Sequence, residues 1–275
     1  MKMLNKIFNF YTLVIINVAI IWAAELSGQG HLFFETGAIH GIAILFIILA
    51  LTRLVEHYYI ADPILKRFLQ GSLAALLLFS ASHVIEFLSY FVAGSYTDAL
   101  FASVANFYLL SLLMIIIGAE YFLQYYYHRS PQIVRLLMVT AAAFFALTVW
   151  FVFQPASVSL DLQSSTPYLY TLMLCIIGGY AVVDTIQIGK AIPFFKDFSG
   201  VLTMAVGLII FAAVTNIFYD LHGALGVDEY QFVYLSHFTF YAALSAIYLS
   251  FGKLTGTTGL HRDIREFAEG GAAGP

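Results

Sequence analysis

An all-α integral membrane protein, built as a bundle of eight transmembrane helices, is the fold class that the sequence predicts. Three observations lead to it. Of the 275 residues, 61% are hydrophobic and only 10% are charged, with a mean hydropathy of +0.88, whereas a soluble domain averages about 25% charged residues. Eight stretches approach the length of about 20 apolar residues that a membrane-spanning helix needs. With eight helices, every Lys and Arg falls on one side of the membrane.

The eight predicted helices are separated by readable breaks. They cover residues 9–26, 35–56, 67–93, 99–126, 132–153, 167–189, 199–219 and 229–251. Asp62-Pro63 ends the second helix, and Ser130-Pro131 opens the fifth, as expected because proline disfavours a helical residue before it. We expect the first helix to be retained, because further spans follow it and it lacks the small-residue cleavage site of a signal peptide.

The distribution of charge predicts the orientation. Membrane proteins concentrate Lys and Arg in their cytoplasmic loops. Here the basic residues fall before helix 1, around the connections 2–3, 4–5 and 6–7, and after helix 8, at Lys2, Lys6, Arg53, Lys66, Arg67, Arg129, Arg135, Lys190, Lys196, Lys253, Arg262 and Arg265. Both termini are therefore predicted to be cytoplasmic. In a bacterium or archaeon the membrane would be the plasma (inner) membrane.

The chain is predicted to form one domain. Residues 1–252 make up the polytopic membrane domain, and residues 253–275 form a short, Gly-rich cytoplasmic tail. The hexapeptides LLLFSA at 76–81 and LIIFAA at 208–213 begin similar stretches in the third and seventh helices. They leave open a duplication of four plus four helices, which would preserve the orientation of each half.

Composition also excludes several classes of protein. A net charge of −4 leaves no basic surface for a nucleic acid. The only cysteine, Cys175, lies in an apolar run, so neither a disulfide scaffold nor a cysteine-built zinc site is expected. The predicted partners are the lipid bilayer and either another membrane protein or a second copy of the chain.

Polar residues of five predicted helices share one layer of the membrane. Ionisable side chains in hydrocarbon are costly, so each is a functional candidate. The helical rise places this layer roughly 5–15 Å below the outer surface. Its principal members are His40, His83, Glu86 and His237. Candidate supporting residues around them are Ser80, Asn106, Asn216, Asp220, His222 and Tyr241.

These side chains suggest a metal or haem site. His83-x-x-Glu86 places an imidazole and a carboxylate one helical turn apart, and helical bundles use this spacing, in the order Glu-x-x-His, for metal sites. Together with His40 and His237, it offers ligands suited to Zn, Cu or Fe. Two of the histidines could instead be the axial ligands of a b-type haem. The alternative is that the same polar groups only form hydrogen bonds with one another between helices.

A second polar layer is predicted toward the cytoplasm. Its members are Arg53 and Glu56 on the second helix, Glu120 on the fourth and Asp184 on the sixth. Arg53 is expected to pair with Asp184 or Glu120. The layer is either a set of structural ion pairs or, together with the outer layer, a path for protons or ions.

One resemblance bears on the chemistry. Ser80, His83 and His237 are loosely similar to the Ser and His residues of seven-helix membrane hydrolases of the alkaline ceramidase and adiponectin-receptor type, in which three histidines hold a zinc ion. However, Tyr241 occupies the position of that family's second histidine in the last helix, and the expected Asp does not follow His83. The chain is therefore not assigned to that family.

Four functional hypotheses follow. The first is a membrane protein whose metal ion or haem serves a redox or sensory role. The second is a membrane-embedded hydrolase that uses the same site, with Glu86 as general base for a metal-bound water. The third is a proton-coupled transporter, and the fourth is a non-catalytic subunit of a membrane complex. A retinal protein is excluded, because no Lys lies deep in a helix.

Overall fold

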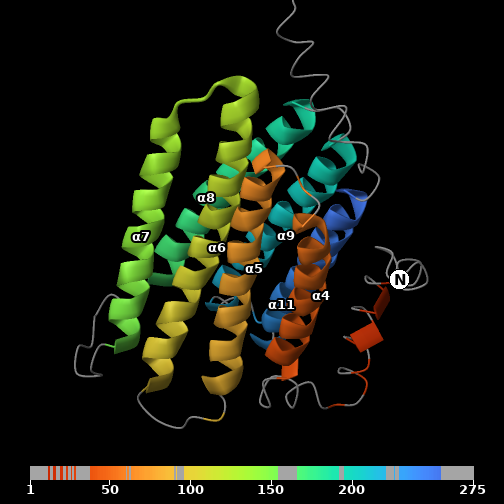
Figure 1. The fold of residues 1–275 in the computed structure, drawn as a ribbon. Coiled ribbons are helices and arrows are strands. Elements are labelled where there is room, and N and C mark those ends of the chain that lie inside the picture. The colour runs from red at the N-terminus through yellow and green to blue at the C-terminus, as the bar shows by residue number, and fades with distance from the viewer. Residues whose placement is uncertain are drawn as a thin grey trace, which may run out of the picture.

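The computed structural model shows an up-and-down bundle of long helices (Figure 1). It describes residues 38–59, 63–89, 96–153, 166–191, 195–220 and 229–254, together with scattered single positions, and it leaves some side chains near the helix ends undescribed. In these ranges the regular structure is entirely helical. The all-helical class predicted from the sequence is therefore confirmed.

Seven helices lie within the described residues. They are α4 (Ala38–Tyr58), α5 (Pro63–Ser89), α6 (Tyr96–Tyr127), α7 (Pro131–Phe153), α8 (Thr166–Ala191), α9 (Lys196–Asp220) and α11 (Glu229–Lys253). Each coincides with one of the last seven predicted spans to within a few residues. The first predicted span, 9–26, lies mostly outside the described residues. The count of eight and the cytoplasmic termini stay predictions.

Four described segments are long and apolar enough to cross a membrane. They are Ala38–Tyr58, Pro63–Leu88, Asn106–Tyr127 and Leu172–Lys190. Many large apolar side chains on the outside of the bundle are exposed, among them Leu45, Leu77 and Ile176. Such a surface is unfavourable in water and favourable against lipid tails. The chain is therefore a membrane protein in contact with the bilayer.

Local sequence explains how the helices begin. Pro63 and Pro131 are the first residues of α5 and α7, the position where the missing N–H of proline costs least. At the start of α7, the Ser130 hydroxyl accepts a hydrogen bond from the Gln132 amide, and the Ser130 carbonyl accepts one from Ile133. Ser130 is thus the N-cap of α7, and only three residues separate α6 from α7.

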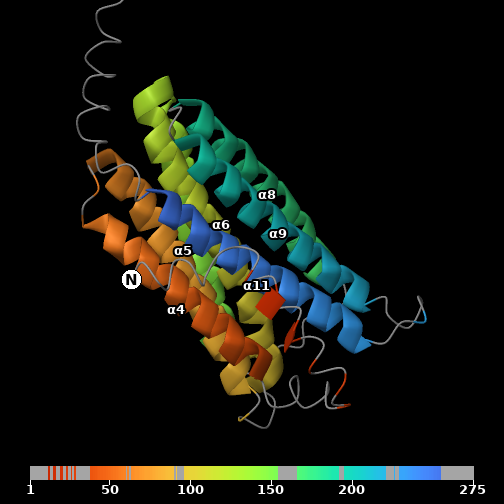
Figure 2. The same cartoon turned by 90° about the vertical axis from the view of Figure 1, so that its right-hand side faces the viewer.

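Six of the helices pack in a closed ring. Neighbouring pairs are α4 and α5, α5 and α6, α6 and α8, α8 and α9, α9 and α11, and finally α11 and α4. Figure 2 shows α11 lying between α4 and α9. α7 lies outside the ring and packs on α6 through a separate apolar cluster that includes Leu113 and Ala141.

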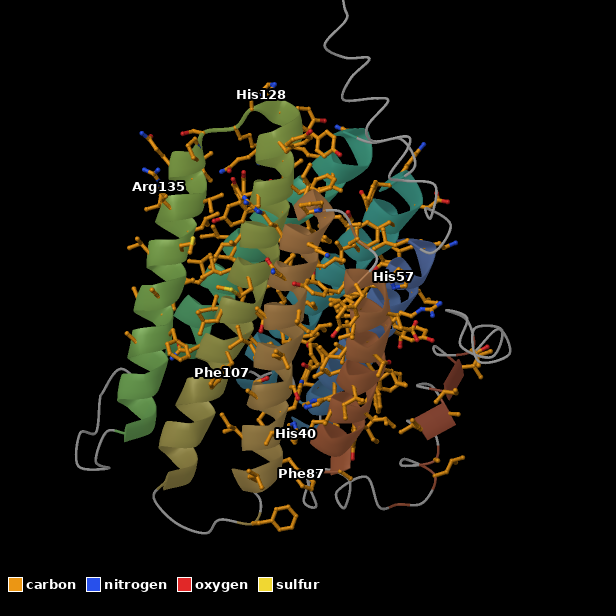
Figure 3. The ribbon with its side chains drawn as sticks, in the orientation of Figure 1. His40, His57, Phe87, Phe107, His128 and Arg135 are labelled. Atoms are coloured by element: carbon orange, nitrogen blue, oxygen red, sulfur yellow. The ribbon has the colours of Figure 1, made fainter. Side chains whose placement is uncertain are left out.

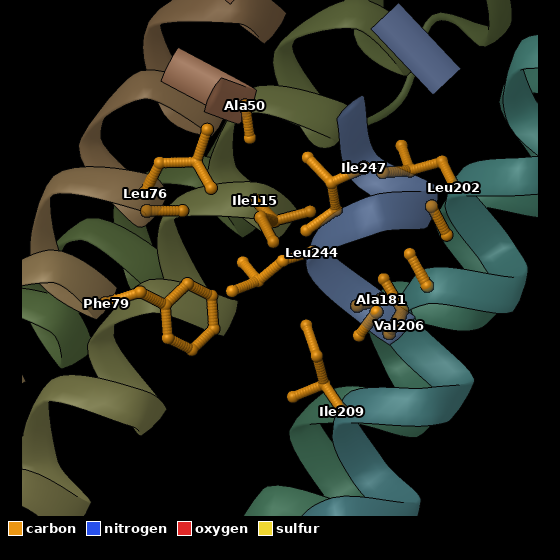
Figure 4. Packing of buried hydrophobic residues seen from close by; sticks show 14 of the residues in the cluster. Ala50, Leu76, Phe79, Ile115, Ala181, Leu202, Val206, Ile209, Leu244 and Ile247 are labelled. Atoms are coloured by element: carbon orange, nitrogen blue, oxygen red, sulfur yellow. The ribbon is translucent and has the colours of Figure 1, made fainter. Parts of the chain in front are cut away.

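The inside of the ring is filled by apolar side chains. One buried cluster contains residues of all six ring helices (Figure 4), including Ala50, Phe79, Ile115, Ala181 and Leu244. Phe79 and Leu244 are fully buried. The middle of the bundle is therefore a packed apolar core, and the buried ionisable groups lie toward its two ends.

Two glycines bring α5 and α6 into backbone contact. A Cβ added to Gly71 would meet backbone atoms of Met114 and Gly118, and one added to Gly118 would lie 2.9 Å from the Phe68 carbonyl oxygen. Backbone atoms cannot move aside as a flexible side chain can. The absence of side chains at these positions therefore allows the close approach of the two helices.

We expect Gly71→Ala to destabilise the protein by about 1–3 kcal/mol, the usual cost of overpacking, measured by thermal unfolding in detergent. Gly207→Ala is the matched control, because Gly207 is a helical glycine with open space around its Cβ position. That control should be stabilised by up to about 1 kcal/mol through helix propensity. Equal changes in stability for the two substitutions would contradict the backbone contact between α5 and α6.

Candidate metal centre

Three of the four principal ligand candidates, His40, His83 and Glu86, come from two neighbouring helices. His40 is the third residue of α4, and His83 and Glu86 lie near the end of α5. The two helices run in opposite directions, so these positions meet at one end of the bundle. Figure 3 shows His40 and Phe87 toward this end of the bundle, and His128 and Arg135 at the other end.

The ligand atoms of these residues converge. The Nδ1 atoms of His40 and His83 are 3.4 Å apart. Oε2 of Glu86 lies 3.1 Å from Nδ1 of His40 and 2.9 Å from Nδ1 of His83. Among the described residues, these three form a group whose ligand atoms all lie within 4.8 Å of one another. The grouping expected from depth and helix face is thus realised for His40, His83 and Glu86.

A metal ion fits this triangle. Atoms with separations of 2.9, 3.1 and 3.4 Å leave a point about 2 Å from each of them, slightly out of their plane, which matches the length of Zn–N and Zn–O bonds. Neighbouring ligand atoms of a tetrahedral or octahedral ion with such bonds are themselves about 3 Å apart. The side chains would therefore need little rearrangement to bind an ion.

The surroundings bury both imidazoles and orient that of His83. Exposed fractions are 4% for His40 and 1% for His83. The hydroxyl of Tyr108, on α6, lies 3.0 Å from Nε2 of His83. The hydroxyl of Tyr241, on α11, donates a hydrogen bond to the carbonyl of Ile39, the residue before His40. Metal-bound histidines usually have their second nitrogen oriented by such a partner.

His237 lies beside the cluster without joining the convergent group. Its ring centroid is 5.0 Å from that of His40 and 6.3 Å from that of His83. It comes from α11, so three ring helices contribute histidines to one place. His237 is partly exposed. Its predicted role as a fourth ligand stays a prediction.

The predicted supporting residues have different positions. Tyr241 contacts the site as described, with its ring 6.4 Å from that of His237. Asn106 is buried on α6, but within the part of the chain that the structure describes neither polar atom of its side chain has a hydrogen-bond partner. Ser80 is half-buried on α5. The side chains of Asn216 and Asp220, and all of His222, lie outside the described residues.

The inner polar layer is divided between two places. Arg53 pairs with Glu56 on the same helix, with Nη1 and Oε2 2.8 Å apart. The expected pairing of Arg53 with Asp184 or Glu120 is wrong, because α4 packs on α5 and α11, whereas those carboxylates belong to α6 and α8. Their partner is Arg129, from the connection between α6 and α7.

Arg129 connects three segments of the chain. Its Nη1 donates to Oε1 of Glu120 and to Oδ1 of Asp184, and its Nη2 donates to Gln187. Burial lowers the pKa of Arg129, but the hydrogen bond to Asp184 and the charge of Glu120 outweigh burial and raise it overall. The guanidinium therefore keeps its positive charge.

Sequence reasoning did not single out Tyr108 or the binding role of Arg129. Tyr108 could have been found from the hairpin of α5 and α6, because residues equally far from the turn, one on each helix, lie at the same depth. Gly71 faces Gly118, Phe68 faces Phe122 and, by the same rule, His83 faces Tyr108. No comparable rule indicates Arg129, since loop positions do not follow the helical repeat.

Comparison of the chain with protein-family models, with curated proteins and with solved structures finds no match in any of the three.

We expect Tyr108→Phe to weaken metal binding about 10- to 100-fold, the usual effect of losing the group that orients a ligating histidine. Titration of the metal-free protein in detergent would measure the change. Tyr125→Phe is the control, because Tyr125 is an exposed tyrosine on the same helix. If both variants bind metal as tightly as the wild type, Tyr108 only packs against His83.

Proposed function

We propose that this membrane protein works through a single transition-metal ion bound by His40, His83 and Glu86. The observation that carries the proposal is the convergence of three ligand atoms within 4.8 Å, from two helices, at one end of the bundle. Hydrogen bonding alone would also bring these groups together. The ion adds the positive charge that would balance the largely buried Glu86 carboxylate.

The donor set narrows the choice of metal. Two imidazoles and one carboxylate are typical of catalytic zinc sites and of non-haem iron sites, and imidazole also suits copper. Three protein ligands leave at least one coordination position open. His237 would close it as a fourth ligand, or a small molecule would occupy it.

The geometry favours an ion over a haem. A porphyrin bound by both His40 and His83 would have to lie between their nitrogens, with the iron about 2 Å from each. The observed separation of 3.4 Å between the Nδ1 atoms, with the Glu86 carboxylate at the same point, suits a bare ion better. A haem bound through His237 stays a prediction.

For the role of the ion, we favour redox chemistry or sensing. The burial of His40 and His83 allows access to an electron or a small molecule more easily than to a large substrate. A zinc-dependent hydrolase is the second candidate, favoured by the open coordination position. In that case Glu86 would be a ligand, so the general base would have to be another group.

A transport path through both polar layers has less support. Tyr108, level with His83, and Glu120 are separated by about 18 Å along α6. Of the α6 residues between them, only Ser111 has a hydrogen-bonding side chain, and its hydroxyl donates to the Phe107 carbonyl within the same helix. The two polar clusters are therefore treated as separate sites.

The deciding experiment is elemental analysis of the detergent-purified protein, combined with absorption spectra of oxidised and reduced samples. We expect one transition-metal ion per chain, lost in His83→Ala and in Glu86→Gln. His128→Gln is the matched control, because His128 is an exposed histidine of the 128–130 connection. It should keep the full metal content.

Each result leads to a different conclusion. Iron or copper with a spectrum that changes on reduction would support the redox role, whereas zinc would make hydrolysis the next assay. A folded wild-type protein that stays metal-free after incubation with Zn²⁺, Fe²⁺ and Cu²⁺ would overturn the proposal. The histidine cluster would then be a packing element of a protein that acts as a transporter or a complex subunit.

A further inference from the structure

A second cluster of buried ionisable groups lies at the opposite end of the bundle from the metal centre. It contains Glu120 of α6, Asp184 of α8 and Arg129 of the connection that follows α6. Two neutral side chains complete it, because Gln187 accepts a hydrogen bond from Arg129 and the hydroxyl of Tyr180 donates one to Glu120. Nothing in the proposed metal chemistry uses these groups.

The charges of this cluster do not balance. Two carboxylates share one guanidinium, and both use the same nitrogen, Nη1 of Arg129. The other charged side chains that the structure describes at this end, in the connection and on the helices packed around the cluster, are Lys66 and Arg67 on α5, His128 in the connection, Arg135 on α7, Lys190 on α8, and Lys196 and Asp197 on α9. Lys66 is half-buried and lies over the ring of Tyr58, and the others are exposed. Among these described side chains, none forms an ion pair with either carboxylate. With both ionised, the cluster carries a surplus negative charge.

Half of each carboxylate also lacks a hydrogen-bond partner. Oε2 of Glu120 and Oδ2 of Asp184 are buried, and no donor of the described residues reaches them, while their other oxygens contact Arg129. The exposed fractions of the two residues are 0% and 1%. A buried, uncompensated carboxylate costs several kcal/mol, so a positive ligand at these two oxygens is strongly favoured.

We propose that Glu120 and Asp184 form a proton-binding site, in which the pair holds one proton while Arg129 balances the remaining charge. A proton needs a single free oxygen and converts it into a donor. A metal cation fits less well, because Mg²⁺ and Ca²⁺ require six or more oxygen ligands, and the Arg129 guanidinium already occupies the other two carboxylate oxygens.

The site has a route for exchange with water. The side chain of Arg129 is 20% exposed, and it belongs to the short connection at the end of the bundle. The proton therefore enters and leaves at this end, beside Arg129. This inference is independent of the metal centre, because the two clusters share no residue.

Infrared spectroscopy of the full chain in detergent tests the proposal, since the carbonyl stretch of a protonated carboxyl is resolved from that of a carboxylate. At neutral pH we expect a protonated-carboxyl signal equivalent to one group, which shifts in D₂O. Because one guanidinium balances one carboxylate, either Asp184→Asn or Glu120→Gln alone should abolish this signal. Arg129→Gln should roughly double it.

Glu56→Gln is the control, because it removes a carboxylate that is paired with Arg53 outside the cluster. It should leave the signal unchanged. The wild-type spectrum is informative even if a variant fails to fold, because the absence of any protonated-carboxyl signal at neutral pH would overturn the proposal. A signal that survives both carboxylate substitutions would also overturn it. So would a signal that disappears when NaCl replaces choline chloride, since a metal cation would then be the ligand.

Discussion

The backbone contact between α5 and α6 sets the register on which both polar clusters depend. Gly71 and Gly118 have no side chains, so the two helices meet along their backbones. This contact fixes the level and rotation of each helix relative to the other. A shift of one residue would turn every α6 side chain by about 100°. Tyr108 would then leave His83, and Glu120 would turn away from Tyr180 on α8.

The apolar interior requires that the charges within each cluster be balanced. In water, Glu86 or Asp184 would be an ordinary solvated carboxylate. Inside this bundle each carboxylate needs a positive partner, because hydrocarbon cannot solvate it. Around Glu86 the neighbours are imidazoles, which are good metal ligands. Around Asp184 the neighbour is a guanidinium, which binds no metal and is already shared. The same surplus negative charge therefore favours a metal ion at one end and a proton at the other.

The sequence was sufficient to predict the depth of each polar residue and the helix face on which it lies. It was not sufficient to predict which helices pack against one another. Hydropathy located the seven described helices, although α5 begins at Pro63 rather than at 67, because its first turn includes the charged Lys66. A membrane-spanning helix can continue past its apolar segment into the region between the hydrocarbon and the water. Helical rise alone predicted that His40 and His83 share a level. Which helices touch depends on side-chain packing over the whole ring, so the pairing of Arg53 could not be derived from its depth.

The three-residue connection between α6 and α7 links the ring to the helix outside it. His128 follows α6 in the left-handed conformation, with φ of 50°, and Ser130 caps α7. Arg129 lies between these two fixed residues, so the backbone aims its side chain back toward α6 and α8. A change in the charge of Glu120 or Asp184 alters the attraction on Arg129 directly. Protonation of the pair would therefore act on the start of α7, a helix that packs mainly on α6 among the helices that the structure describes.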